Sequence, residues 1–157
     1  RMYPAEHRRF MNLPVADKLI VFADILSFLD YTNSSGYVAV DFYDGSIIYD
    51  ADSRKTTICD IDFFRKQPCV NDMGRMWGSS KFQSPEEYKL GADIDEITNV
   101  YCAGAFAFAI FGNYNRTHDD WQLSDEAFEV ATKAVSNDRN ERYQGIKELR
   151  DAWGKNL

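Results

Sequence analysis

Hydrophobic residues occupy every face of one stretch near the middle of the chain, Asn99–Gly112. No charged residue occurs from Val100 to Phe111, and a helix that is apolar all round has no side to present to water. The stretch is shorter than the about 20 apolar residues that span a bilayer. We therefore expect a buried central helix. A pair of buried strands is the alternative, because periodicity alone does not separate the two for short apolar runs.

Apolar faces elsewhere predict helices around this central one. Pro14 suits the first turn of a helix, and a broad apolar face follows it until the polar run Thr32–Gly36. Ser124 is a typical cap for a further helix that extends to about Val135. Residues 1–13 are mostly polar and charged, and we expect a short helix with a loop there.

The remaining pattern predicts a small β ribbon, a long irregular stretch and two more helix boundaries. Three short extended runs are expected, at Tyr37–Val40, Ile47–Tyr49 and Thr56–Cys59. An irregular stretch then extends to Gln83, and Ser84-Pro-Glu-Glu87 has the features of a capping box that starts a helix. A last helix is expected from about Arg142 to Trp153. The fold class is therefore α+β and mainly α-helical.

Composition limits the classes of function. The 157 residues correspond to one domain, and their net charge of −7 with dispersed Lys and Arg argues against a nucleic-acid partner. The three cysteines lack metal-ligand spacing, which favours a reducing, cytoplasmic setting, and no segment predicts contact with a membrane. The chain begins with Arg1 rather than Met, and we expect it to be a fragment.

Five short motifs follow one another between Pro14 and Trp153. They are Tyr37–Asp50, Ile58–Asp62, Gly78–Glu86, Asn99–Gly104 and Asp138–Tyr143. In this order they resemble the H-R-D-L-x-x-x-N catalytic loop, the I-x-D-F-G magnesium segment, the G-T-x-x-Y-x-A-P-E end of the activation segment, the start of the buried F helix and the D-P-x-x-R-Y signature of the protein kinase superfamily. The resemblance is to the C-terminal lobe of eukaryotic-like serine/threonine kinases. It implies a kinase-like C-lobe with a small β ribbon and a central buried helix.

The resemblance also implies roles for four residues. Asp41 corresponds to the catalytic residue that orients the acceptor hydroxyl, and Asp60 to a ligand of the Mg²⁺ that bridges the phosphates of ATP. Ser46 stands where the family has Asn as its second metal ligand, and Asp62 adds a carboxylate beside Asp60. The implied cofactors are ATP and Mg²⁺. The implied partner is a protein or small-molecule phosphate acceptor.

Two structural pairings follow from the same resemblance. Glu86 and Arg142 match the Glu and Arg that form a buried ion pair in the family. Asn99 replaces an Asp at the start of the F helix, and its side chain can still accept hydrogen bonds from the backbone of the catalytic loop.

Several positions depart from the family pattern. Ala39 and Val40 replace the His and Arg before the catalytic Asp, and Tyr43 replaces the catalytic-loop Lys. No Gly-rich phosphate loop and no V-A-I-K lysine occurs, so the small N-terminal ATP-binding lobe is absent from this chain. We expect phosphoryl transfer to a hydroxyl group, as on protein Ser or Thr, in a full-length parent, and no activity from the fragment alone. The alternative is a pseudokinase that binds nucleotide or protein without catalysis.

Two further stretches bear on contacts with partners. Asn113–Leu123 is too short for the G helix that shapes the docking surface for protein substrates in the family. Arg75 and Trp77 form an unusual pair within the long irregular stretch. Packing of Trp77 against the lobe is favoured over contact with a substrate or nucleotide.

Overall fold

The computed structural model describes residues 4–156, which fold into five α-helices and six short strands. The helices are α1 (Pro4–Met11), α2 (Val15–Ser34), α3 (Glu96–Phe111), α4 (Asp125–Ala134) and α5 (Ile146–Lys155). The strands are β1 (Tyr37–Val38), β2 (Ile47–Asp50), β3 (Lys55–Ile58), β4 (Arg65–Lys66), β5 (Cys69–Val70) and β6 (Asp93–Ile94). Single 3-10 turns occur at Asp44–Ser46, Pro85–Tyr88 and His118–Asp120. The fold is α+β and mainly helical, as predicted.

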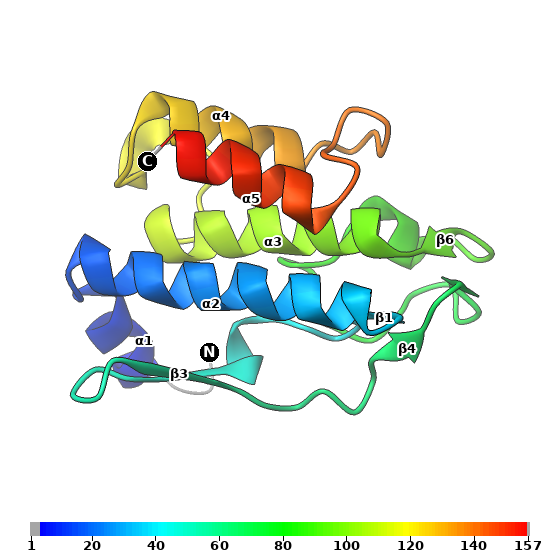
Figure 1. The fold of residues 1–157 in the computed structure, drawn as a ribbon, viewed down its shortest axis with the longest axis horizontal. Coiled ribbons are helices and arrows are strands. Elements are labelled where there is room, and N and C mark those ends of the chain that lie inside the picture. The colour runs from blue at the N-terminus through cyan, green and yellow to red at the C-terminus, as the bar shows by residue number, and fades with distance from the viewer. Residues whose placement is uncertain (1–3, 157) are drawn as a thin grey trace.

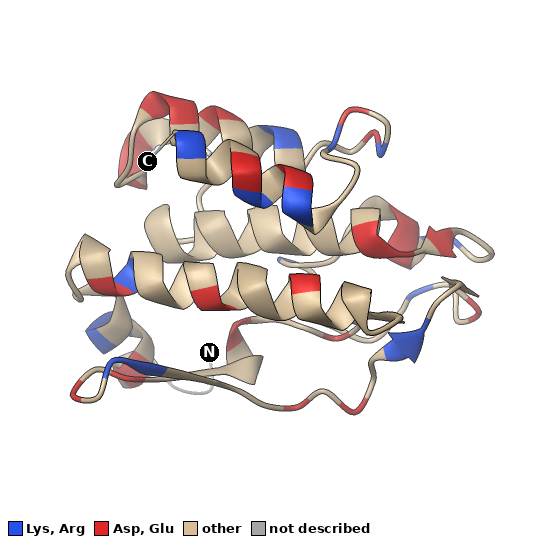
Figure 2. Ribbon diagram, in the orientation of Figure 1, with Lys and Arg blue, Asp and Glu red and all other residues tan. Residues whose placement is uncertain are grey.

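Helix α3 is the buried centre of the molecule. It lies between α2 on one side and α4 with α5 on the other (Figure 1), and its body carries no charged side chain (Figure 2). Every residue from Thr98 to Phe111 is buried, which confirms the expected central helix. The helix begins three residues earlier than expected, because the Asp95 side chain accepts a hydrogen bond from the N–H of Ile97 and caps it.

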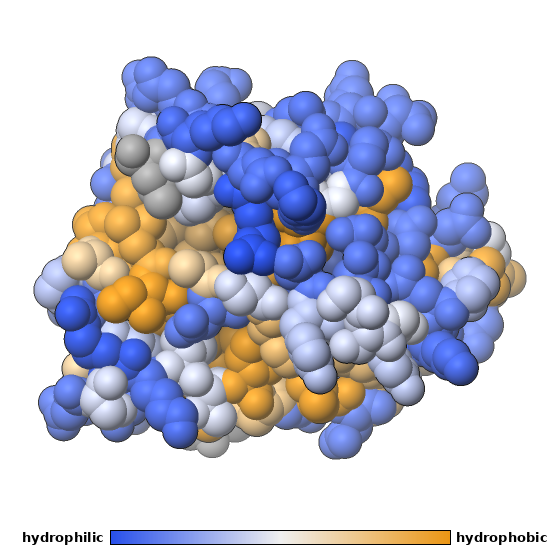
Figure 3. Space-filling view, viewed as in Figure 1, coloured by the Kyte–Doolittle hydropathy of each residue, from blue (hydrophilic) through white to orange (hydrophobic). Residues whose placement is uncertain are grey.

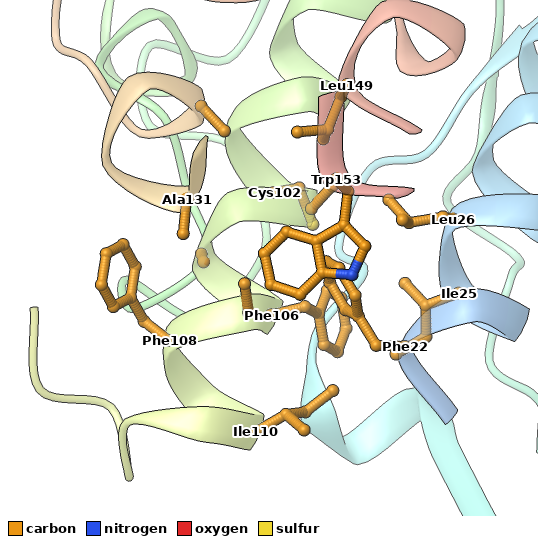
Figure 4. Packing of buried hydrophobic residues seen from close by; sticks show 14 of the residues in the cluster. Phe22, Ile25, Leu26, Cys102, Phe106, Phe108, Ile110, Ala131, Leu149 and Trp153 are labelled. Atoms are coloured by element: carbon orange, nitrogen blue, oxygen red, sulfur yellow. The ribbon is translucent and has the colours of Figure 1, made fainter. Parts of the chain in front are cut away.

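Close packing between α3 and α4 depends on Gly104. A Cβ at this position would lie 2.7 Å from the Ala134 Cβ and 2.8 Å from the Val135 Cγ1. Helices α5 and α2 also contact each other, because Trp153 of α5 packs its ring against Phe22 of α2, with 4.6 Å between the centroids (Figure 4). The central helix thus joins three helices into one hydrophobic core.

The β structure consists of three separate two-stranded antiparallel pairs. Strands β2 and β3 pair along their whole length, with Ile47 opposite Ile58 and Asp50 opposite Lys55. Strand β1 is only two residues long and pairs with β4, while β5 pairs with β6. The three predicted extended runs thus contain strands. The last three strands were not predicted.

Two further helix boundaries differ from the prediction. The capping box at Ser84 forms, since Glu87 accepts from the backbone N–H and the hydroxyl of Ser84. It begins only the turn Pro85–Tyr88, and Gly91 with a φ of 79° then redirects the chain into β6. The last helix begins at Ile146 rather than near Arg142. Glu96 of α3 accepts from the N–H of Ile146 at 2.8 Å and so supplies a cap from a distant part of the chain.

Among residues 4–156, no helix combines the length and the apolar character needed to cross a membrane. The face in Figure 3 is mostly hydrophilic. Hydrophobic side chains reach this surface at its left end and along its lower edge.

Candidate functional site

The loop that carries Asp41 is fixed to the core on both sides. Val40 and Phe42 are buried, and the Phe42 ring lies 5.1 Å from that of Phe106 on α3, between centroids. Asp41 therefore emerges from the core between two anchored neighbours. Its backbone has a φ of 58°, which few residues other than glycine adopt.

Two hydrogen bonds from α3 hold this loop in place. The Asn99 Nδ2 donates to the carbonyl oxygen of Ala39 at 2.8 Å, and the Asn99 Oδ1 accepts from the N–H of Ala39 at 2.9 Å. The predicted bond from the loop backbone to Asn99 is therefore present. The amide group of Asn99 also donates a hydrogen bond to the loop backbone, which was not predicted.

The β2–β3 hairpin brings the second carboxylate to the same place. Asp60 follows β3, and the N–H of its neighbour Cys59 donates to the Ser46 carbonyl at 2.9 Å. Asp60 also has a φ of 58°. Both candidate carboxylates therefore occupy a backbone conformation that costs on the order of 1 kcal/mol or more, and such strain clusters at functional sites.

Asp41 and Asp60 interact electrostatically. Burial raises the pKa of Asp41, and the negative charge of Asp60 raises it further. Neither carboxylate forms an ion pair or a hydrogen bond with another residue of the described chain. Two like charges without a protein counter-ion favour the binding of a proton or a cation.

Tyr43 lies in the field of the same two carboxylates. Burial raises the pKa of its phenol, and the charges of Asp41, Asp60 and Asp44 add to the shift. A Cβ at Gly45 would lie 2.4 Å from the ring of Tyr43, so only glycine allows the ring to lie there. The phenol is therefore a neutral hydrogen-bond donor at physiological pH.

The other two predicted metal ligands are placed differently. Ser46 is fully buried, and its Oγ has no hydrogen-bond partner among the described residues. Asp62 is exposed, and residues 4–156 contain no group of three or more His, Cys, Asp or Glu side chains arranged to hold a metal ion. The structure thus brings Asp41 and Asp60 together. It does not gather Asp62 with them into a three-carboxylate cluster.

A small cavity lies beside Asp41. Its volume is about 10 Å³, room for one water molecule. Both polar and apolar residues form its wall: Ala39, Asp41, Phe42, Gly78, Ser79, Phe82, Gln83, Glu87, Thr98, Asn99 and Cys102. Sequence reasoning included Glu87 only as part of a capping box. Burial raises its pKa to about 7, against the lowering effect of its hydrogen bonds with Ser84.

The predicted ion pair between Glu86 and Arg142 is present and buried. The Arg142 Nη1 lies 2.7 Å from the Glu86 Oε1 and the Nη2 3.0 Å from the Oε2. Burial alone would raise the pKa of Glu86, but the hydrogen bonds and charge of Arg142 outweigh it and lower that pKa. Arg139 joins the pair from outside, bonding to Glu86 and to Asp95. Its part in the network was not predicted.

The expected packing of Trp77 against the lobe is wrong. Its side chain is 57% exposed, and its ring contacts the ring of Phe63, which is also exposed, at 6.3 Å between centroids. Met76, the preceding residue, is buried instead. Of these two neighbours, only the thioether side chain of Met76 packs into the protein, and the indole of Trp77 stays in contact with solvent.

No known protein-family model matches this sequence, and none of the curated proteins matches it either.

Proposed function

We propose that the chain is the C-terminal lobe of a divergent kinase-like protein, which in its full-length form transfers phosphate from ATP to a hydroxyl acceptor such as protein Ser or Thr. In this proposal Asp41 receives the acceptor proton, and Asp60 holds the Mg²⁺ that accompanies ATP. The single observation that carries it is the meeting of Asp41 and Asp60. The two come from different strand ends and have no counter-ion among residues 4–156.

The donor set suits a hard cation that prefers oxygen ligands. Asp60 and Asp41 supply carboxylate oxygens, and the orphaned Oγ of Ser46 lies in the same hairpin as Asp60. In the proposed complex Asp60 is the main ligand, with Ser46 and Asp62 as further candidates. Bound Mg²⁺ would supply charge neutralisation for the phosphates.

The protein's own groups have defined tasks in this proposal. Asp41 orients the acceptor hydroxyl and takes its proton, and a pKa above the usual Asp value makes that carboxylate a better base. Asn99 keeps the loop before Asp41 from shifting. Tyr43 cannot replace the positive charge of a lysine, but its neutral phenol can donate a hydrogen bond to a phosphate oxygen.

A pseudokinase is the second candidate, and two observations favour it. Ser46 is fully buried, so its hydroxyl reaches a metal only if the hairpin rearranges. In addition, the described residues hold no cluster of three acidic or metal-binding side chains. A non-catalytic protein of this kind would use the same lobe to bind nucleotide or another protein.

Binding of Mn²⁺ tests the proposed metal role of Asp60, because this paramagnetic ion broadens the NMR signals of nearby amides. We expect broadening centred on residues 41–46 and 58–62 of chain 1–157, lost in Asp60→Asn and retained in Asp24→Asn, a matched control on the exposed face of α2. Unchanged broadening in Asp60→Asn would exclude the proposed metal role. Broadening spread evenly over the acidic surface would exclude it as well.

A further inference from the structure

Exposed hydrophobic side chains gather on one segment of the molecule. Six of the eleven large hydrophobic residues that are exposed in the described chain lie between residues 63 and 90. They are Phe63, Val70, Met73, Trp77, Tyr88 and Leu90. Single exposed hydrophobic residues are normal, but such a concentration on one segment marks an interaction site. We call it the 63–90 surface. In Figure 1 it is the green segment from β4 to the turn before β6.

The backbone beneath these side chains is held firmly. Asn71 is buried, and its side chain bonds to the backbone at Met73, Gly74 and Glu86. The Gln83 Nε2 donates to the carbonyl oxygens of Met76 and Trp77, at 2.9 and 3.1 Å. The segment therefore presents its side chains from a preorganised backbone, which lowers the entropy cost of binding.

Two aromatic contacts organise the outer face. The rings of Phe63 and Trp77 are in contact with their planes tilted by 42°, and the guanidinium of Arg75 lies 5.9 Å from the ring centroid of Tyr88. Since Met76 points inward, Arg75 and Trp77 on either side of it are both exposed. Trp, Tyr and Arg are the residues that most often carry the binding energy of protein interfaces.

The charge of this surface is opposite to that of the whole chain. Residues 63–90 contain five basic side chains, Arg65, Lys66, Arg75, Lys81 and Lys89, and three acidic ones, Asp72, Glu86 and Glu87. Glu86 and Glu87 are buried, and Asp72 is paired with Arg65. The solvent-facing charge is therefore positive on a chain whose net charge is −7. Electrostatic complementarity then favours an acidic partner.

We propose that the 63–90 surface docks an acidic polypeptide segment that packs an apolar or aromatic side chain against the exposed rings of Phe63 and Trp77. Exposed basic side chains of the 63–90 surface, Arg75 and Lys81 among them, select for the negative charges of the bound polypeptide. This inference is independent of phosphoryl transfer and holds equally for a catalytic and a non-catalytic protein.

Fluorescence anisotropy with three labelled synthetic peptides tests the proposal on chain 1–157. The first peptide alternates Asp and Glu around a central Leu-Phe pair, the second has Lys in place of every acid, and the third has Ala in place of Leu-Phe. We expect only the first to bind, with an affinity that falls as salt is added. Trp77→Ala should weaken binding at least about tenfold, and Lys81→Glu should weaken it and reduce its salt dependence.

Two matched variants control for non-specific effects. Tyr31→Ala removes an exposed aromatic ring, and Lys55→Glu reverses an exposed charge, both outside the 63–90 surface. Neither should change the affinity, and circular dichroism should show every variant folded. Equal binding of the first peptide by Trp77→Ala and by the unaltered chain would overturn the proposal, as would tighter binding of the lysine peptide. A dimer of the chain that Trp77→Ala dissociates would also overturn it, because the occupant would then be a second copy.

Discussion

The side chain of Asn99 bonds to both the N–H and the carbonyl oxygen of Ala39, and so ties the centre of the molecule to the residue two positions before Asp41. Both partners are buried. The pair of bonds mimics the exchange between two strands, although one member is a side chain on a helix. The position of the candidate site is thus set directly by the core helix.

Asn99→Ala should lower the free energy of unfolding by about 2 kcal/mol, because the buried N–H and carbonyl of Ala39 lose their partners. Urea denaturation would measure the change. Asn115→Ala removes an exposed side chain whose one bond within residues 4–156 is to Asp120, and its effect should stay within about 0.5 kcal/mol. Equal effects of the two substitutions would show that the Ala39 bonds add nothing to stability.

Arg142→Ala should be the most destabilising of these substitutions, costing about 3–5 kcal/mol, because it strands the buried charge of Glu86. Arg150→Ala breaks an ion pair with Asp30 that is partly exposed, and it should cost less than about 1 kcal/mol. Thermal melting followed by circular dichroism compares the two. Replacing both members of the buried pair, Glu86→Leu with Arg142→Met, should restore part of the loss. No recovery in the double variant would refute this account.

Glu87 should make the fold less stable as the pH rises. Its pKa is about 7 in the folded chain and 4.5 in the reference state, so unfolding releases its proton anywhere between those values. The contribution is fully present below about pH 4.5 and is lost as the pH rises through 7, a span of about 3 kcal/mol. Glu87→Gln should therefore match the unaltered chain in stability at low pH and exceed it above pH 7. Denaturation at a series of pH values measures the difference.

The same substitution at Glu129, which is exposed on α4, serves as the control for the pH series. Its stability should follow that of the unaltered chain at every pH. A parallel course for Glu87→Gln and the unaltered chain would mean that Glu87 stays ionised in the fold.

Substitutions of Asp60 should reveal the strain at its backbone. Asp60→Val places a β-branched residue at a φ of 58° and should cost more than about 1 kcal/mol. Asp60→Gly relaxes the backbone and removes one of two like charges, so stability should be unchanged or higher even though the proposed metal ligand is lost. Urea denaturation ranks the three proteins. A lower stability for Asp60→Gly than for Asp60→Val would contradict the strain argument.

Chain 1–157 alone should show no turnover of ATP. Phosphoryl transfer depends on positioning and charge neutralisation, and this chain has neither a phosphate-covering glycine loop nor a lysine in the candidate catalytic loop. Transfer of radiolabelled phosphate is the assay, and activity is expected only from a longer protein that supplies those elements. Transfer by the fragment that disappears in Asp41→Asn would refute the prediction.

The sequence predicted the parts of the fold that depend on local patterns. The uncharged run after Asn99 predicted the buried helix α3, and Ser124 was correctly predicted to cap α4. The turn after Glu87 and the late start of α5 at Ile146 were missed for a physical reason. The turn ends because the chain turns back into β6. The start of α5 depends on Glu96, which caps it from fifty residues away.

The candidate site could be predicted only in part for the same reason. Asp41 and Asp60 were recognised because their flanking residues carry a pattern. The raised pKa of Glu87 and the exposure of Trp77 depend on which segments of the chain pack against these two residues in the fold. The residues adjacent in the sequence do not determine this packing. Met76 is buried and Trp77 is exposed, although the indole has more apolar area to bury.

The close packing of Gly104 against Ala134 and Val135 limits how the molecule can move. Helix α3 cannot rotate about its axis or slide by a turn past α4 without driving another side chain into that contact. Helix α3 is therefore a rigid element that contacts α4 through Gly104 and holds the Asp41 loop through Asn99. Any motion that accompanies binding must therefore occur in segments that α3 does not hold.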